Sequence, residues 1–380
     1  MQLKWWGIGI AFAIVGCAGL APAVRADASD DDDNGGALLR YFNDSNHILV
    51  RSMMGDYTFT LPKSAALAVH WNNERVTIPA VSAPPGSPEA VDAITTASRP
   101  ISGNAYQDFI KVRNEVTGEM TKGNGAFNYY VSMESDYLAQ QVGAHYAKDL
   151  NDAKLNLSMG TSYGWDRIDP LPDDDTRTSP ASKTTLHWNA EATQVLSPVT
   201  MLRVGVEYNL VEGLQHNPYR NVYAGGTIVP ENQPDERQRR DVFVRVNQYL
   251  QNRSSLKFSY RLYNDDWGIT SHELGARLSQ YITPGTYVRY QYRYYTQTAA
   301  DFYRAEYLTT NGIDGYLTGD YRMAALSSHL FGVAVHFDLG TLAADTRWLR
   351  PLGLWANYER YFNSNNYSAD ILETGVGLHF

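Results

Sequence analysis

The stretch YVRYQYRYY, from Tyr287 to Tyr295, places a charged or amide side chain at every second position. Arg289, Gln291 and Arg293 form this polar set, and the residues between them are apolar or aromatic. Successive side chains of an extended strand point to opposite faces, so the spacing predicts a strand with one charged face and one aromatic face. Taken alone, the segment fits either a half-buried strand of a soluble protein or a membrane strand.

The same alternation runs through most of the chain. It is clear in KTTLHWNAEAT (183–193), MLRVGVEYNL (201–210), LKFSYRLY (256–263) and ILETGVGLHF (371–380). Runs with the helical period are missing, so the pattern predicts an all-β chain. The expected strands between Gly36 and Phe380 number sixteen and lie near 37–43, 47–60, 65–73, 109–121, 127–135, 138–149, 154–164, 183–196, 200–213, 241–251, 256–266, 271–282, 286–299, 326–339, 352–362 and 368–380.

The connections between these strands alternate in length. Minimal turns such as LPKS (61–64) and KGNG (122–125) alternate with long polar segments near 73–107, 164–182, 214–240 and 304–324. Short periplasmic turns and long extracellular loops are typical of outer-membrane barrels. An even number of strands also puts both termini on the periplasmic side. We therefore predict a transmembrane antiparallel β-barrel of about sixteen strands.

Composition narrows the class of protein further. The chain contains 27 tyrosines, and beyond the N-terminal leader no segment reaches the roughly 18 consecutive apolar residues that a membrane helix needs. A helical membrane protein is excluded. The formal net charge is −9, and RQRR (237–240) is the one basic run, which argues against nucleic acid as a partner.

The N-terminus has the features of a secretory leader. Lys4 supplies the positive charge, an apolar run follows, and VRA ending at Ala26 is a small-residue cleavage site. We expect residues 1–26 to be a signal peptide, 27–35 an acidic disordered tail and 36–380 the outer-membrane β-barrel. The single cysteine, Cys17, ends the sequence IVGC, which resembles a lipoprotein box, so lipidation at Cys17 is an alternative to cleavage after Ala26.

The apolar face of each strand decides between a soluble and a membrane barrel. This face is continuous in strand after strand, whereas the opposite face carries charged side chains on almost every strand. A membrane barrel turns its apolar face to lipid and closes every backbone hydrogen bond between strands. The last strand ends on Phe380, which resembles the signal read by the outer-membrane assembly machinery. We therefore expect a location in the bacterial outer membrane, with lipid, lipopolysaccharide and that machinery as partners.

Several motifs resemble an uncharacterised family of Gram-negative exported barrels, known as a domain of unknown function. They are DAITTASRP (92–100), MESDY (133–137), HNPYRNVY (216–223), PENQPDERQRRDV (230–242), YRLYNDDWGITSHELG (260–275) and YRYYTQTAADFYR (292–304). The resemblance implies a bacterial outer-membrane β-barrel and implies no activity. It also suggests a connection with envelope redox systems.

One group of candidate site residues would line the lumen. Basic positions cluster on the strands expected between 241 and 299, and acidic positions fall mostly elsewhere. Opposed walls of this kind orient polar solutes and select ions by sign, whereas charges that merely pair would stiffen or block the barrel. The lumen candidates are Arg245, Lys257, Arg261, Arg277, Arg289, Arg293, Glu191, Glu207, Glu359 and Glu373.

A second group is expected near the outer rim. It consists of Glu134, Asp136, His216, Asp265, Asp266, His272 and Asp301. Carboxylates and imidazoles can hold a divalent cation, but no pair here has a diagnostic metal spacing. We therefore expect no metal and no cofactor.

The sequence has no recognisable hydrolase motif of nucleophile, base and orienting partner, so we do not expect an enzyme. The preferred interpretation is a porin-like diffusion channel for small polar or charged solutes. The alternative is a non-conducting binding or scaffold barrel that serves a cell-envelope system, with a redox link. The sequence leaves the solute and the oligomeric state open.

Overall fold

The computed structural model describes residues 34–79, 108–170, 179–342 and 345–379. The expected signal peptide, the acidic run at 30–33, most of the segment 73–107 and Phe380 lie outside the described residues. The first strand begins at Asn34, within the last residues of the expected tail. No helix in the described part of the chain is long and apolar enough to cross a membrane.

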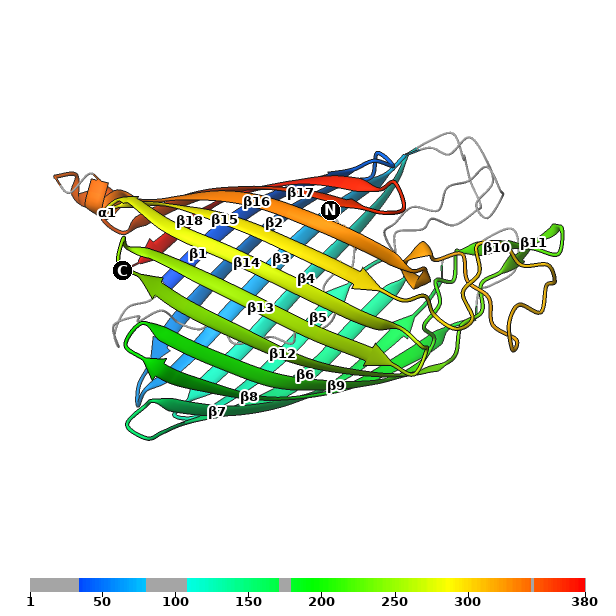
Figure 1. Cartoon of the computed structure of the whole chain (residues 1–380), viewed down its shortest axis with the longest axis horizontal. Helices are drawn as coiled ribbons and strands as arrows, with labels where there is room; N and C mark the ends of the chain where they lie inside the picture. The colour runs from blue at the N-terminus through cyan, green and yellow to red at the C-terminus, as the bar shows by residue number, and fades with distance from the viewer. Residues whose placement is uncertain (1–33, 80–107, 171–178, 343–344, 380) are drawn as a thin grey trace, which may run out of the picture.

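Sixteen strands form one closed antiparallel barrel, as the alternation predicted (Figure 1). In chain order they are β1 (Asn34–Asp44), β2 (Leu49–Leu61), β3 (Ala65–Ile78), β4 (Phe109–Lys122), β5 (Gly125–Met133), β6 (Tyr137–Leu150), β7 (Leu155–Ile168), β8 (Ala181–Ser197), β9 (Thr200–Gly213), β12 (Glu236–Leu250), β13 (Ser254–Asp265), β14 (Thr270–Thr283), β15 (Thr286–Gln297), β16 (Leu326–Asp338), β17 (Leu352–Asn363) and β18 (Ser368–His379). A separate hairpin consists of β10 (Asn221–Ala224) and β11 (Thr227–Pro230).

Each expected strand corresponds to one barrel strand. The largest differences are at β3, which continues to Ile78, and at β12, which begins at Glu236 inside the run expected to be a loop. Both extensions are pairing effects: Arg75 and Val76 pair with β2 and β4, and Arg237 pairs with Val211 of β9. Local composition does not reveal a partner strand that comes from elsewhere in the chain.

The barrel closes between its first and last strands. β1 pairs with β18 from Asn34 opposite His379 to Asp44 opposite Ala369, and β1 also pairs with β2 along its other edge. No strand of the ring is therefore left with an open edge. Closure is what allows a sheet to lie in hydrocarbon, because an unpaired backbone group there has no water to bond.

The two faces of the wall differ as the alternation predicts. On β15, Tyr290 is 48% exposed on the outer face, whereas Gln291 donates a hydrogen bond to Glu359 and Arg293 lies 3.7 Å from Glu273 on the inner face. Tyr290 thus faces outward and Arg293 faces inward, so YVRYQYRYY is a membrane strand and not a half-buried strand of a soluble protein. The same arrangement on the other strands surrounds a polar lumen with an apolar outer surface.

The two ends of the barrel differ in the length of their connections. Short turns lie at the end that carries the C-terminus, and the hairpin β10–β11 extends beyond the opposite end (Figure 1). One connection at the short-turn end is longer: residues 339–351 include helix α1 (Leu339–Leu342) and a 3-10 turn at Arg347–Leu349. The short-turn end is the periplasmic end in an outer-membrane barrel.

The orientation of the two faces generates a prediction for β8. We expect Ala190→Arg, on the exposed outer face, to lower the free energy of unfolding in lipid vesicles by about 2–4 kcal/mol, because it places a charge in hydrocarbon. Asn189→Arg is the matched control, since Asn189 lies on the inner face opposite Glu207. Denaturant unfolding followed by tryptophan fluorescence measures both values, and equal losses would contradict the assigned faces.

Candidate functional site: the lumen and the segments across its mouth

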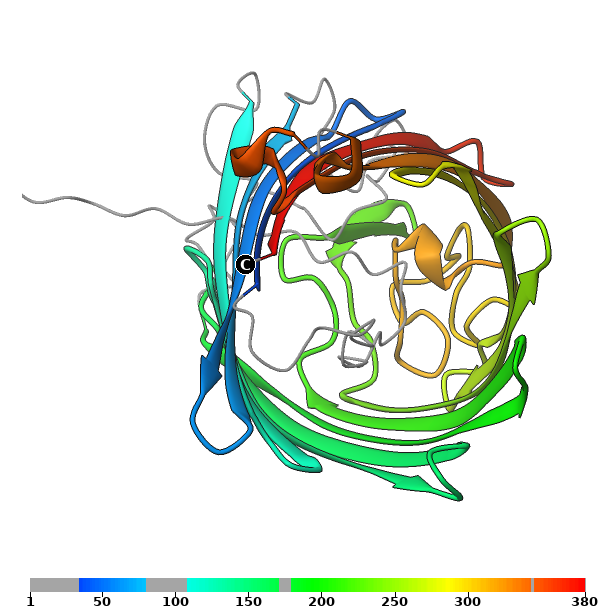
Figure 2. The same ribbon diagram turned by 90° about the vertical axis from the view of Figure 1, so that its left-hand side faces the viewer.

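Two long connections fold over the extracellular end of the lumen. They are the β9–β12 segment (residues 214–235) and the β15–β16 segment (residues 298–325). Viewed along the barrel from its periplasmic end, both segments lie within the circle of strands (Figure 2). We call the two segments together the plug.

The plug contacts distant parts of the wall. Tyr219 of the β9–β12 segment donates a hydrogen bond of 2.6 Å to Asp136, in the turn between β5 and β6. On the β15–β16 segment, Tyr321 packs against an apolar cluster at the extracellular end of the lumen wall. That cluster consists of Phe42, Ile48, Val50, Val76, Ile78, Leu330, Tyr361, Tyr367 and Ala369. The plug is therefore anchored on two separate sides of the mouth.

The two segments of the plug also bind each other. Asn232 and Leu317 exchange backbone hydrogen bonds of 3.0 and 2.9 Å, and the N–H of Gly225 donates to the carbonyl of Tyr307 at 2.9 Å. A small apolar core of Val222, Ala224, Tyr307 and Leu317 lies between the segments. The plug consequently has packing of its own, beyond its contacts with the wall.

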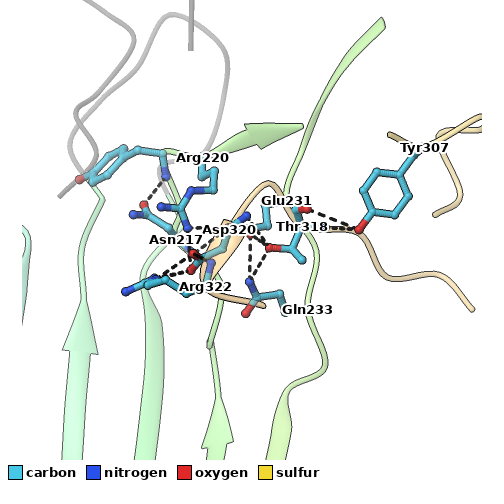
Figure 3. A network of polar contacts seen from close by, with 9 residues as sticks. Asn217, Arg220, Glu231, Gln233, Tyr307, Thr318, Asp320 and Arg322 are labelled. Atoms are coloured by element: carbon cyan, nitrogen blue, oxygen red, sulfur yellow. Dashed lines mark hydrogen bonds and ion pairs between the residues drawn. The ribbon is translucent and has the colours of Figure 1, made fainter. Parts of the chain in front are cut away.

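A buried ionic network joins the segments at their centre (Figure 3). The Arg220 guanidinium lies 3.1 Å from the Asp320 carboxylate and 3.8 Å from that of Glu231. Asp320 also binds Arg322 through its side chain, and Glu231 accepts hydrogen bonds from Thr318 and from Gln233. Arg220, Asp320 and Glu231 are almost completely removed from solvent and Arg322 is half-buried, so the charges depend on one another for compensation.

Burial affects the two acids of the network in opposite directions. Burial raises the pKa of Glu231, and Arg220 offsets only part of this effect. Burial also acts to raise the pKa of Asp320, but the guanidinium groups of Arg322 and Arg220 outweigh it and hold that pKa below its ordinary value. Asp320 is therefore the fixed anion that ties the two segments together.

A cavity of about 800 Å³ lies in the lumen between the plug and the wall. Charged side chains line it on both sides, among them Arg113, Glu207, Arg239 and Asp241 of the wall, and Arg322 of the plug. Aromatic side chains contribute as well, including Tyr130, Tyr137, Tyr219, Tyr263, Trp267 and Tyr295. The cavity is large enough for a small solute and has polar groups for it on every side.

Most inward cations along the wall have a carboxylate partner. Arg261 lies 3.3 Å from Glu207 and 3.2 Å from Asp241. The other such pairs in the lumen are Arg40–Glu373, Lys111–Glu134, Lys111–Asp136, Arg113–Glu74, Arg113–Glu115, Lys183–Asp166, Arg203–Glu191, Arg237–Asp265 and Arg293–Glu273. The charges are thus interleaved over most of the wall, which fits the alternative in which inward charges pair with one another.

Four of the lumen candidates differ from this pattern. Arg245, Lys257, Arg277 and Arg289 face the lumen, and none has a carboxylate within 4.0 Å among the residues that the structure describes. Two of them make direct contacts with neutral side chains: Arg277 donates to the side-chain oxygen of Gln291 at 3.1 Å, and Arg289 donates to the hydroxyl of Tyr287 at 3.2 Å. The nearest carboxylates are more distant, and Glu359 is connected to Arg277 only through Gln291. We call Arg203 and these four residues the cation row.

The acidic lumen candidates are also inward. Glu191 and Glu207 lie beside Arg203 and Arg261, respectively. Glu373 pairs with Arg40, and Glu359 accepts hydrogen bonds from Gln291 and, at 3.1 Å, from Asn357. All ten lumen candidates therefore face the interior of the barrel.

The rim candidates are dispersed. Glu134 and Asp136 share the ammonium group of Lys111, and Asp265 binds the guanidinium of Arg237.

The other rim candidates lie apart from these pairs. His216 lines the cavity, Asp266 accepts a hydrogen bond from the backbone of Gln238, and Asp301 lies at the exposed start of the β15–β16 segment. His272 lies on the outer face, where the hydroxyl of Tyr260 is 2.8 Å from its Nδ1. Within the described ranges, no three His, Cys, Asp or Glu side chains are close enough together to hold a metal ion.

Sequence analysis missed several residues of the site. Arg203 belongs to the cation row, and the alternation in MLRVGVEYNL already placed it on the polar face, so that signal was present. Arg220 and Asp320 are 100 positions apart in loops of irregular sequence. No local pattern could have indicated that they meet.

These features together define the class of protein. A closed barrel of sixteen strands, apolar outside and charged inside, is an integral outer-membrane β-barrel, and its place is the bacterial outer membrane. Lipid and lipopolysaccharide therefore surround its outer face.

Comparison with known proteins connects the chain to a family. The family described as "Protein of unknown function (DUF3570)" matches residues 174–348, a range that contains the last four of the six motifs. The match confirms the resemblance to an uncharacterised outer-membrane barrel family. A search of curated proteins finds no match.

Solved structures of outer-membrane proteins are similar at low identity. OmpT of Vibrio cholerae is 10% identical, with 93% of this chain and 99% of that chain covered and a TM-score of 0.45. OccK11 (OpdR) of Pseudomonas aeruginosa is also 10% identical, with 92% and 95% covered and a TM-score of 0.42. At these values the similarity says nothing about what this chain binds or transports.

The ionic network makes the stability of the closed plug depend on Asp320. We expect Asp320→Asn to reduce the opening free energy of the β15–β16 segment by about 3–5 kcal/mol, because it leaves two buried guanidinium groups without their main anion. Hydrogen exchange of residues 298–325 measures this value. Glu306→Gln, at an exposed position of the same segment, is the control and should change it by less than about 0.5 kcal/mol. Equal effects of the two variants would contradict the network's role.

The raised pKa of Glu231 should make the stability of the closed plug depend on pH. Because its pKa is raised above the ordinary value of 4.5 when the plug is closed, the closed plug binds a proton that the opened plug releases. The contribution of Glu231 to closure should therefore be fully present below pH 4.5 and be lost as the pH rises from 4.5 through the raised pKa. Hydrogen exchange of residues 214–235, corrected for intrinsic rates, measures this trend. Glu231→Gln should remove it, and an unchanged trend in that variant would show another origin.

Proposed function

We propose that this barrel is a diffusion channel for small polar or charged solutes, narrowed at its extracellular end by the plug. The observation that carries the proposal is the cavity of about 800 Å³ between the plug and the wall. A polar cavity of this size inside the lumen suits the passage of a small hydrophilic solute. Charged and aromatic side chains around the cavity provide contacts that a small hydrophilic solute can exchange for water.

The lumen charges support a preference for anions. In the cation row, Arg203 alone has a carboxylate partner among the described residues, Glu191 at 3.5 Å. A net positive wall raises the local concentration of anions and lowers that of cations. The plug restricts the size of the solute, because it contacts the wall near both β5 and the cluster formed by β1–β3 and β16–β18.

The ionic network favours a second candidate function. Arg220, Asp320 and Glu231 are almost completely buried, and they fasten the two plug segments to each other. A plug fixed this firmly suits a non-conducting binding or scaffold barrel that serves a cell-envelope partner. Under that alternative, the cavity would hold a ligand or water without passing it on.

Planar-bilayer recording of the purified barrel distinguishes the two functions. The channel proposal expects discrete conductance steps and, in a potassium chloride gradient, a reversal potential of the sign that anion preference produces. Asp320→Asn should increase the conductance or the frequency of opening, because it loosens the plug, whereas Glu306→Gln should leave the record unchanged. If neither the wild type nor Asp320→Asn conducts at any voltage, the scaffold function is the correct one.

A further inference from the structure

We propose that the cation row is a binding site for small polyanions of the phosphate type in the periplasmic half of the lumen. The inference deepens the proposed function, since it names a solute class for the channel, but the site itself would exist in a non-conducting barrel as well. The observation behind it is a contrast within one wall. Most other inward cations of the wall have a carboxylate partner, whereas four of the five cations of the row have none within 4.0 Å among the described residues.

The register of the strands brings the row together. Arg203 on β9 faces Arg245 on β12, and Lys257 on β13 faces Arg277 on β14. Arg289 on β15 faces Ser279, which follows Arg277 by two residues on the same face. Like charges directly opposite each other destabilise a sheet. The two pairs therefore destabilise the barrel, and no structural contact in the described part of the chain explains why these cations are placed opposite each other.

The depth of the row separates it from the plug. Arg203, Lys257 and Arg289 are each the fourth residue of a strand that begins at the periplasmic end. The plug lies at the extracellular end, and Arg245 of the row also lines the cavity beneath it. A solute that left the cavity toward the periplasm would therefore meet the row next.

Neutral groups position the cations without neutralising them. The Arg245 guanidinium lies 4.5 Å from the ring centre of Phe243, and the Arg289 guanidinium lies 5.5 Å from that of Tyr287. Arg289 also donates to the hydroxyl of Ser279 at 3.4 Å, and Arg277 donates to Gln291. Stacking and single hydrogen bonds fix the planes of the guanidinium groups and leave other N–H donors for a ligand.

The geometry suits an oxyanion that carries more than one charge. Adjacent strands are roughly 4.7–4.9 Å apart, so cations on neighbouring strands can bind one phosphate group or two linked groups together. Arginine binds phosphate oxygens through two parallel N–H donors, and charge-assisted bonds of this kind are about twice as strong as neutral ones. A singly charged chloride ion satisfies only one position of the row at a time.

Binding of pyrophosphate to the purified full-length barrel in detergent tests the site. Isothermal titration calorimetry should show saturable binding that weakens as sodium chloride is added. Arg277→Gln and Lys257→Gln should each weaken binding by at least about tenfold. Lys148→Gln removes the same charge from the exposed outer face of β6 and should leave the affinity unchanged. Absence of saturable binding, or equal losses in all three variants, would overturn the proposal.

Thermal unfolding without an anion provides a second readout. Because Arg277→Gln relieves repulsion from Lys257, we expect it to unfold at the same or a higher temperature than the wild type, and pyrophosphate should stabilise the wild type more than this variant. A merely structural role predicts a lower unfolding temperature and no differential effect of pyrophosphate, which would count against the site.

Two further experiments distinguish the phosphate site from the channel function and from binding of the chain's own acidic run. If pyrophosphate binds and the barrel does not conduct, the binding site is supported and the channel function is wrong. If the barrel conducts and pyrophosphate does not bind, the channel function is supported and the binding site is wrong. A variant in which the aspartates at 30–33 are replaced by serine tests the chain's own acidic run as the occupant. If only that variant binds pyrophosphate, the row belongs to the acidic run and the proposal of a solute site is wrong.

Discussion

Closure of the sheet is the constraint on which the rest of this structure depends. Within hydrocarbon, a backbone N–H or carbonyl group has no water to bond, so every strand must have a neighbour on each side. Pairing of β1 with β18 meets that requirement for the whole ring. Closure also separates two environments, one of lipid and one of water and protein, and the period of two assigns each side chain to one of them.

Charges follow from this separation. At the depth of the hydrocarbon, arginine, lysine and carboxylate side chains are costly on the outer face, so most of them lie on the inner face, where they are close to one another and partly desolvated. Over most of the wall the protein pairs them between nearby strands, as Arg261 of β13 is paired with Asp241 of the adjacent β12 and with Glu207 of β9, one strand further on. The cation row is the exception to this pairing. Cations left without a close carboxylate in a lumen where most charges are paired are a stronger indication of function than the total number of charges.

The plug shows a different use of buried charge. Arg220, Asp320 and Glu231 join two segments that the chain places far apart, and a small apolar core supports the contact. Ion pairs buried in this way contribute little net stability when compared with apolar replacements, but they are costly to break singly. The position of the plug is therefore well defined, while its attachment responds to changes in a single residue or in pH.

The sequence by itself determined the fold class, the number of strands, their approximate ends and the face on which each strand residue lies, because a period of two is a local property. It also placed Arg289 and Arg293 on the polar face. Only the tertiary structure decided that Arg293 has a carboxylate neighbour and that Arg289 has none within the ranges the structure describes, since that depends on the register between strands. The ion pair between Arg220 and Asp320 could be found only in the complete barrel, because the wall places the β9–β12 and β15–β16 segments together at the extracellular end.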